Sequence, residues 1–144
     1  DTTTTTPPTV APSGNYDKAI DYYNAGVDLH DNYPDQAMEK YNLSLQNSND
    51  IGEVYLNIGL IYITKEDYPN GIHYTKLALS TFDRTNKKVS ETQTLQRLKA
   101  ICNNNLGVVY LRKNDKTTAV SYFKKALDID PTYSTARDNY NANK

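Results

Sequence analysis

The sequence of 144 residues has no tryptophan, one cysteine, one methionine and two phenylalanines. A single cysteine, Cys102, excludes an internal disulfide, so packing alone has to hold the fold together. Hydrophobic residues make up 38% of the chain, which is low for a compact globule, and no apolar run has the length of a membrane span. The sequence shows no signal peptide, and we expect any such segment to precede Asp1.

Motifs for catalysis, phosphate binding and metal binding are also missing. The histidines His30 and His73 are isolated, and no cluster of His, Cys and carboxylate residues has metal-ligand spacing. There is no glycine-rich phosphate loop. We interpret Cys102 as a small buried side chain within a helix rather than as a nucleophile. The sequence therefore predicts a protein that is not an enzyme and needs no cofactor, metal or small-molecule substrate.

Tyrosine, with 13 copies, is the large residue that the sequence does contain, and we expect it to do most of the large-residue packing. Apolar residues at helical spacing mark two short helices between positions 103 and 131: Leu106, Val109 and Tyr110, then Val120, Phe123, Ala126 and Leu127. A polar turn at 113–116 separates them, and Pro131 ends the second helix. Gly107 in mid-helix indicates a close approach by another backbone.

This hairpin resembles the tetratricopeptide repeat, on the following residues: Leu106, Gly107, Tyr110, Ala119, Phe123, Ala126 and Pro131. The same intervals recur around Gly59, at Tyr62, Gly71 and Ala78, with Thr75 in place of the aromatic residue and Tyr74 as its substitute. A third copy surrounds Gly26, with Ala37 and Tyr41 one residue early. The resemblance implies an all-α fold, a right-handed α-solenoid of three helix-turn-helix repeats with a C-terminal capping helix.

The repeats are expected at about 18–50, 51–84 and 100–131 within an array that spans 15–131, and the capping helix at 132–144. Asp50 and Glu53 resemble a capping box for the second repeat. The repeat glycines are 33 residues apart and then 48, so a 14-residue insertion is expected near 85–99. One interpretation of the insertion is a projecting helical hairpin, and the other is a loop.

Residues 1–14 form a Thr/Pro-rich stretch that we expect to be a disordered linker. Such stretches often tether a domain to a lipid anchor, a membrane span or another domain. The alternative is that the segment was added for expression of the protein. The stretch therefore favours an extracytoplasmic or membrane-tethered location and leaves a cytoplasmic one open.

In the family that the sequence resembles, the first helices of successive repeats line a concave groove that binds protein segments. Each repeat glycine follows an asparagine by two positions, at Asn24, Asn57 and Asn105. An amide donates and accepts at once, so it can pair with both backbone groups of an extended peptide. The alternative is that asparagine is simply common at this position of the family's repeat. The candidate peptide-binding groove comprises Asn24, Val27, Leu56, Asn57, Leu60, Asn104, Asn105, Val108 and Arg112.

Family members that bind the acidic tails of cytosolic chaperones use lysine, arginine and asparagine at five fixed positions. This sequence has other residues at four of them, namely Tyr23, Val27, Ile101 and Asn105, and only Asn57 matches. The sequence therefore predicts a protein or peptide partner of another kind.

Charge separates along the chain and leaves two further functions open. Residues 1–72 carry 11 acids and 3 bases, a net −8, and residues 73–144 carry 6 acids and 13 bases, a net +7. Our main hypothesis is a protein–protein interaction scaffold. The alternative is self-assembly into homo-oligomers through oppositely charged ends. The third is nucleic-acid binding by the basic half, which the sequence does not favour because the aromatic residues expected of a nucleic-acid surface are missing beside its cations.

Overall fold

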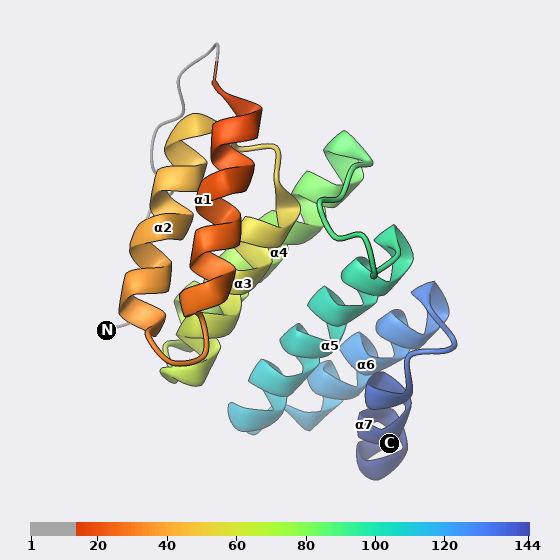
Figure 1. The fold of residues 1–144 in the computed structure, drawn as a ribbon. Helices are drawn as coiled ribbons and strands as arrows, with labels where there is room; N and C mark the ends of the chain where they lie inside the picture. The colour runs from red at the N-terminus through yellow and green to blue at the C-terminus, as the bar shows by residue number, and fades with distance from the viewer. Residues whose placement is uncertain (1–13) are drawn as a thin grey trace. The chain divides into compact units, whose positions relative to one another are not determined.

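The computed structural model describes residues 14–144, where all regular secondary structure is helical (Figure 1). The helices are α1 (Tyr16–Leu29), α2 (Pro34–Asn47), α3 (Gly52–Thr64), α4 (Tyr68–Thr85), α5 (Leu95–Arg112), α6 (Lys116–Ile129) and α7 (Ser134–Asn143). The predicted all-α repeat fold is confirmed. None of these helices is both long and apolar enough to cross a membrane. The predicted linker lies, except for Gly14, outside the described residues.

The helices belong to two compact units, one ending at Val89 and the other beginning at Ser90. In the first unit α1 pairs with α2, α3 pairs with α4, and α2 also contacts α3. In the second unit α5 pairs with α6, and α7 contacts both of them. Each helical pair thus corresponds to one repeat, and α7 covers the last one.

Glycine lets the two helices of each pair interlock. A Cβ atom at Gly26 would lie 2.4 Å from a ring carbon of Tyr41, and one at Gly107 would lie 2.4 Å from a ring carbon of Phe123. Each ring therefore fills the space that a missing side chain leaves. At Gly59 the nearest atoms belong to Thr75, its Oγ1 at 2.6 Å and its backbone nitrogen at 3.1 Å. The helices of the second pair approach so closely there that a ring would not fit.

Tyr74 supplies the aromatic packing of the second pair from the neighbouring position. It is only 4% exposed, and its ring stacks on Tyr62 at 5.5 Å and on Tyr55 at 6.4 Å between centroids. Tyr110 and Tyr122 stack in the same way at 5.5 Å in the second unit. Tyrosine is therefore a main packing residue in both units.

The capping box predicted at Asp50 and Glu53 is absent. Helix α3 begins after Ile51, which makes no side-chain cap. Asp50 instead forms an ion pair of 2.7 Å with Arg84 at the end of α4, and buried Glu53 accepts a hydrogen bond of 2.6 Å from the backbone of Val89. Both acids contact residues more than thirty positions away, which local sequence reasoning could not reveal.

The insertion expected near 85–99 is helical only at its two ends. Helix α4 runs to Thr85, where Asn86 in the left-handed region (φ 51°) terminates it, and α5 begins at Leu95. Residues 86–94 form no helix. The bond from Val89 to Glu53 fixes the start of this connection to α3. The helical-hairpin interpretation therefore does not describe the middle of the insertion.

Candidate functional site

The candidate site is marked by exposed apolar side chains on α1 and α3, which are the first helices of the two repeats in the first unit. Val27 on α1 is 44% exposed and Leu60 on α3 is 37% exposed. Among the described residues, Tyr33 in the turn after α1 is the other large hydrophobic residue with comparable exposure. Asn24 is also exposed and lies one turn before Val27. Surface positions of this kind on a helical repeat are available to a partner.

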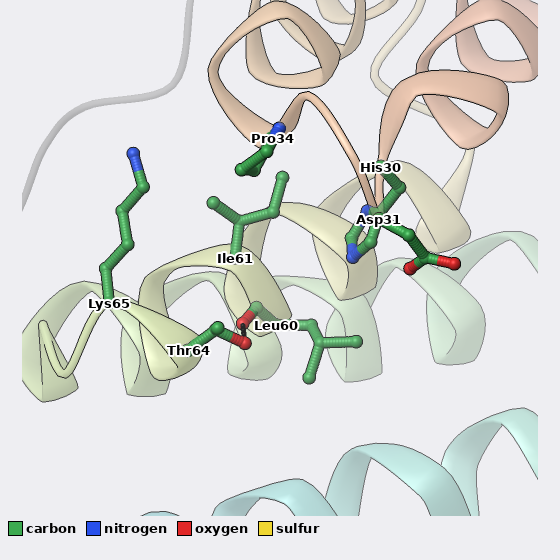
Figure 2. Close-up of a pocket in the computed structure, with 7 residues that line it drawn as sticks. All are labelled: His30, Asp31, Pro34, Leu60, Ile61, Thr64 and Lys65. Atoms are coloured by element: carbon green, nitrogen blue, oxygen red, sulfur yellow. Dashed lines mark hydrogen bonds between the residues drawn. The ribbon is translucent and has the colours of Figure 1, made fainter.

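A hollow of about 230 Å³ lies between the α1–α2 turn and α3 (Figure 2). His30, Asp31 and Pro34 line it from the turn. Leu60, Ile61 and Thr64 line it from the C-terminal half of α3, and Lys65 from the position after the helix. The aliphatic side chains of Pro34, Leu60 and Ile61 make part of the wall apolar, whereas charged and polar groups lie around it.

Hydrogen bonds join His30, which lines the hollow, to Tyr41 and Asn57. The Oη atom of Tyr41 accepts a hydrogen bond of 3.3 Å from Asn57 Nδ2 and lies 2.9 Å from His30 Nδ1. The Tyr41 hydroxyl and His30 Nδ1 share one hydrogen, and the imidazole tautomer determines which of the two donates it. Burial lowers the pKa of His30 despite the opposing charge of Asp31. His30 is therefore neutral at pH 7.

The tyrosines in this chain stay protonated. Burial raises the pKa of Tyr23 to about 12, with the charge of Glu53 adding to the shift and a hydrogen bond from Asn57 opposing it. Burial also raises the pKa of Tyr41. Asn57 of the second repeat thus interacts with Tyr23 and Tyr41, which belong to the first repeat. The carbonyl oxygen of Asn57 is the group that remains for a ligand.

The structure distributes the nine sequence-predicted groove residues over both units. Asn24, Val27, Asn57 and Leu60 belong to the first unit and reach its surface, whereas Leu56 is only 6% exposed. In the second unit Asn104 is 4% exposed and its Oδ1 accepts a bond of 2.9 Å from Asn139 of α7. Asn105 and Val108 are half-buried there, and Arg112 is exposed.

Sequence reasoning missed an acidic stripe along α1. The stripe consists of Asp17, Asp21, Asn24, Asp28 and Asp31, and all five residues are exposed. Spacings of four, three and four residues keep the first four on one side of α1, and Asp31 lies in the turn that follows. Gly26, which packs on Tyr41, faces the opposite side. The spacing was readable in the sequence, but only the packing of Gly26 shows that this side points away from α2.

The expectation that aromatic residues are absent beside the basic residues was wrong. Lys113 lies over the ring of Tyr110 at 5.4 Å and Arg97 over that of Tyr133 at 4.8 Å. Helical spacing brings Lys113 next to Tyr110, and the fold brings Arg97 next to Tyr133, which is distant in sequence. These rings already contact cations of the same chain, so their presence alone does not indicate nucleic-acid binding.

No group of three or more His, Cys, Asp and Glu residues among positions 14–144 could hold a metal ion. Cys102 is fully buried in α5, as a small core side chain would be. The residues that line the hollow offer hydrogen bonds, charge and apolar area.

Comparisons with known proteins agree with this architecture. Family models described as tetratricopeptide repeat match residues 52–81 and 100–133. The N-terminal domain of stress-induced protein-1 (STI-1) from C. elegans is similar in structure, with a TM-score of 0.74 and 16% identity over 90% of this chain and 97% of that one. Comparison with curated protein sequences finds no significant relative.

Two more solved structures share the fold at low identity. The first TPR of Spaghetti (RPAP3), bound to HSP90 peptide SRMEEVD, has a TM-score of 0.73 and 13% identity over 92% of this chain and 94% of that one. The Arabidopsis OM64 TPR domain has a TM-score of 0.73 and 12% identity over 91% of this chain and 98% of that one. Identities this low establish a shared fold and nothing finer.

Proposed function

Starting from the premise that the chain belongs to the tetratricopeptide repeat family, we propose that it is a protein–protein interaction module. Its first unit binds a peptide segment of a partner protein across α1 and α3. The observation that carries this proposal is the exposure of Val27 and Leu60, 44% and 37%, beside a partly apolar hollow. Most other large hydrophobic residues of the described chain are shielded from solvent. Val27 and Leu60 therefore provide apolar surface that a bound peptide would remove from water.

Each part of the surface has a role in this proposal. One apolar side chain of the peptide enters the hollow against Leu60, and another packs on Val27. The amide of Asn24 and the carbonyl oxygen of Asn57 pair with the peptide backbone, which allows binding without strict sequence selection. Asn105, Val108 and Arg112 form a further contact surface on the second unit, considered by itself.

An acidic chaperone tail is not the ligand that we propose. The peptide in the RPAP3 structure, SRMEEVD, has three acidic residues. This chain matches one of the five positions at which such tails are bound, at Asn57. The exposed carboxylates on α1 would repel a peptide of that charge.

The proposal is tested by removing the exposed apolar side chains and measuring peptide affinity. We expect the double variant Val27→Ser and Leu60→Ser to bind a peptide selected from a random display library about tenfold more weakly than the wild type, because apolar contact worth about 1.4 kcal/mol is lost. Fluorescence anisotropy of the labelled peptide measures the affinity.

The matched control is Tyr33→Ser, which removes an exposed hydrophobic side chain that does not line the hollow. We expect it to bind like the wild type, and circular dichroism should show that all three proteins are folded. Equal affinities for the double variant and the wild type would mean that the peptide binds elsewhere.

A further inference from the structure

We infer that the first unit selects a basic peptide, one that places an apolar side chain in the hollow beside Leu60 and lysine or arginine side chains on the acidic stripe of α1. This inference rests on the proposed function and names the chemistry of its ligand. It follows from the position of the stripe, from the charges that surround the hollow, and from the apolar residue that lies between them.

The stripe presents four carboxylates in a row along α1 and into the turn after it. Asp17, Asp21 and Asp28 are exposed on the side of α1 opposite Gly26, and Asp31 is exposed in the turn that follows. Asn24 lies in the middle of this row. The amide proposed to pair with a peptide backbone is therefore flanked on both sides by carboxylates.

Carboxylates outnumber cations along α1 and beside the hollow. Lys18, the one basic residue of α1, lies over the ring of Tyr22 at 5.9 Å. Lys65, the basic residue that lines the hollow, forms an ion pair with Asp35. His30, which also lines the hollow, adds no positive charge at pH 7, because burial lowers its pKa. The carboxylate of Asp31, which also lines the hollow, thus determines the sign of the charge that a ligand meets.

Val27 connects the stripe to the hollow. It lies one turn after Asn24 on α1 and one turn before His30, which lines the hollow. A peptide that crosses α1 toward α3 would therefore meet carboxylates first, then Val27, and finally the hollow with Leu60. A basic segment with a neighbouring apolar residue matches that order of charge and apolar surface.

Exposed charge pairs contribute little free energy each, so the stripe should decide which peptide binds more than how tightly. A random peptide library displayed on phage tests this directly with the full chain. We expect the selected peptides to be enriched in lysine or arginine adjacent to an apolar residue. Acidic or uncharged peptides would overturn this inference and leave the proposed function standing. A library from which nothing is selected would overturn the proposed function, and this inference with it.

Charge variants then locate the selectivity. We expect Asp21→Asn with Asp28→Asn to weaken binding of a selected basic peptide by about fivefold at physiological salt, and the difference should shrink as salt is added. The matched control, Glu39→Gln with Asp138→Asn, changes net charge equally at exposed positions on α2 and α7 and should bind like the wild type.

Two outcomes would contradict the assignment of the stripe. Equal weakening by both double variants would show a general attraction to the protein rather than recognition by α1. The second outcome is self-association of the wild type, measured by sedimentation without peptide. Self-association that the Asp21→Asn and Asp28→Asn variant abolishes would show that the stripe binds another copy of this chain instead of a foreign peptide.

Discussion

At the residue scale, Tyr41 connects three helices of the first unit through one hydroxyl group. Its ring fills the space at Gly26 on α1, and its Oη atom joins His30 at the end of α1 to Asn57 on α3. Tyr41 is fully buried, so its hydroxyl has to find partners within the protein. The position thus combines the packing of a repeat with the orientation of two side chains at the candidate site.

The lowered pKa of His30 predicts that stability depends on pH. The unfolded chain takes up a proton near the ordinary value of 6.5, whereas the folded chain resists it, so His30 destabilises the fold as pH falls from 6.5 through the lowered folded pKa. Urea denaturation at pH about 7.5 and 5.5 measures this. We expect the wild type to lose stability over that range and His30→Gln to lose less. An equal loss in both proteins would show that other groups cause the pH dependence.

At the element scale, Arg97 connects the three helices of the second unit. From the first turn of α5 its Nε atom lies 2.5 Å from Asp130 Oδ2 at the end of α6, and its Nη2 atom donates to Thr132 Oγ1 at 3.1 Å. The guanidinium also lies over Tyr133, the N-cap residue of α7. Hydrogen bonds from Thr132 and then from Arg97 lower the pKa of Asp130. Because α5 begins at Leu95, its first turn includes Arg97, which holds the turn before α7 in place.

We expect Arg97→Met to reduce the free energy of unfolding of the second unit by about 1–2 kcal/mol, because the Asp130 side chain is only 12% exposed and would lose a charged partner. Urea denaturation measures the loss. Thiol labelling of Cys102, which is fully buried in α5, reports opening of the second unit separately. The control is Arg112→Met, at an exposed position of the same helix, which should behave like the wild type. Similar losses in both variants would contradict a special role for Arg97.

At the scale of the whole molecule, the separation of charge leaves self-assembly as an alternative to peptide binding. We expect sedimentation at physiological salt to give a mass near 16.3 kDa at all concentrations. Exposed charges are screened over about 8 Å there and contribute little per pair, and the described residues expose few large hydrophobic side chains. A mass that rises with concentration and falls with added salt would favour assembly through oppositely charged surfaces instead.

Much of the fold could be read from short-range patterns. The glycines at 26, 59 and 107, with apolar residues at helical spacing around them, predicted the helix-turn-helix repeats and the helix after Pro131. These features depend on neighbours three or four positions away, which are visible in the sequence. The same reasoning failed where an acid had a distant partner, as at Asp50 and Glu53, and in the middle of the insertion, which forms no helix.

The candidate site was only partly predictable, for the same reason. The sequence by itself determined that Asn24, Val27, Asn57 and Leu60 recur at equivalent helical positions, since periodicity decides which residues share a face. Only the tertiary structure decided that Asn57 bonds to Tyr41, that Asn104 bonds to Asn139, and that a hollow opens beside Leu60. Those outcomes depend on how side chains from different helices meet, and spacing along one helix carries no information about that.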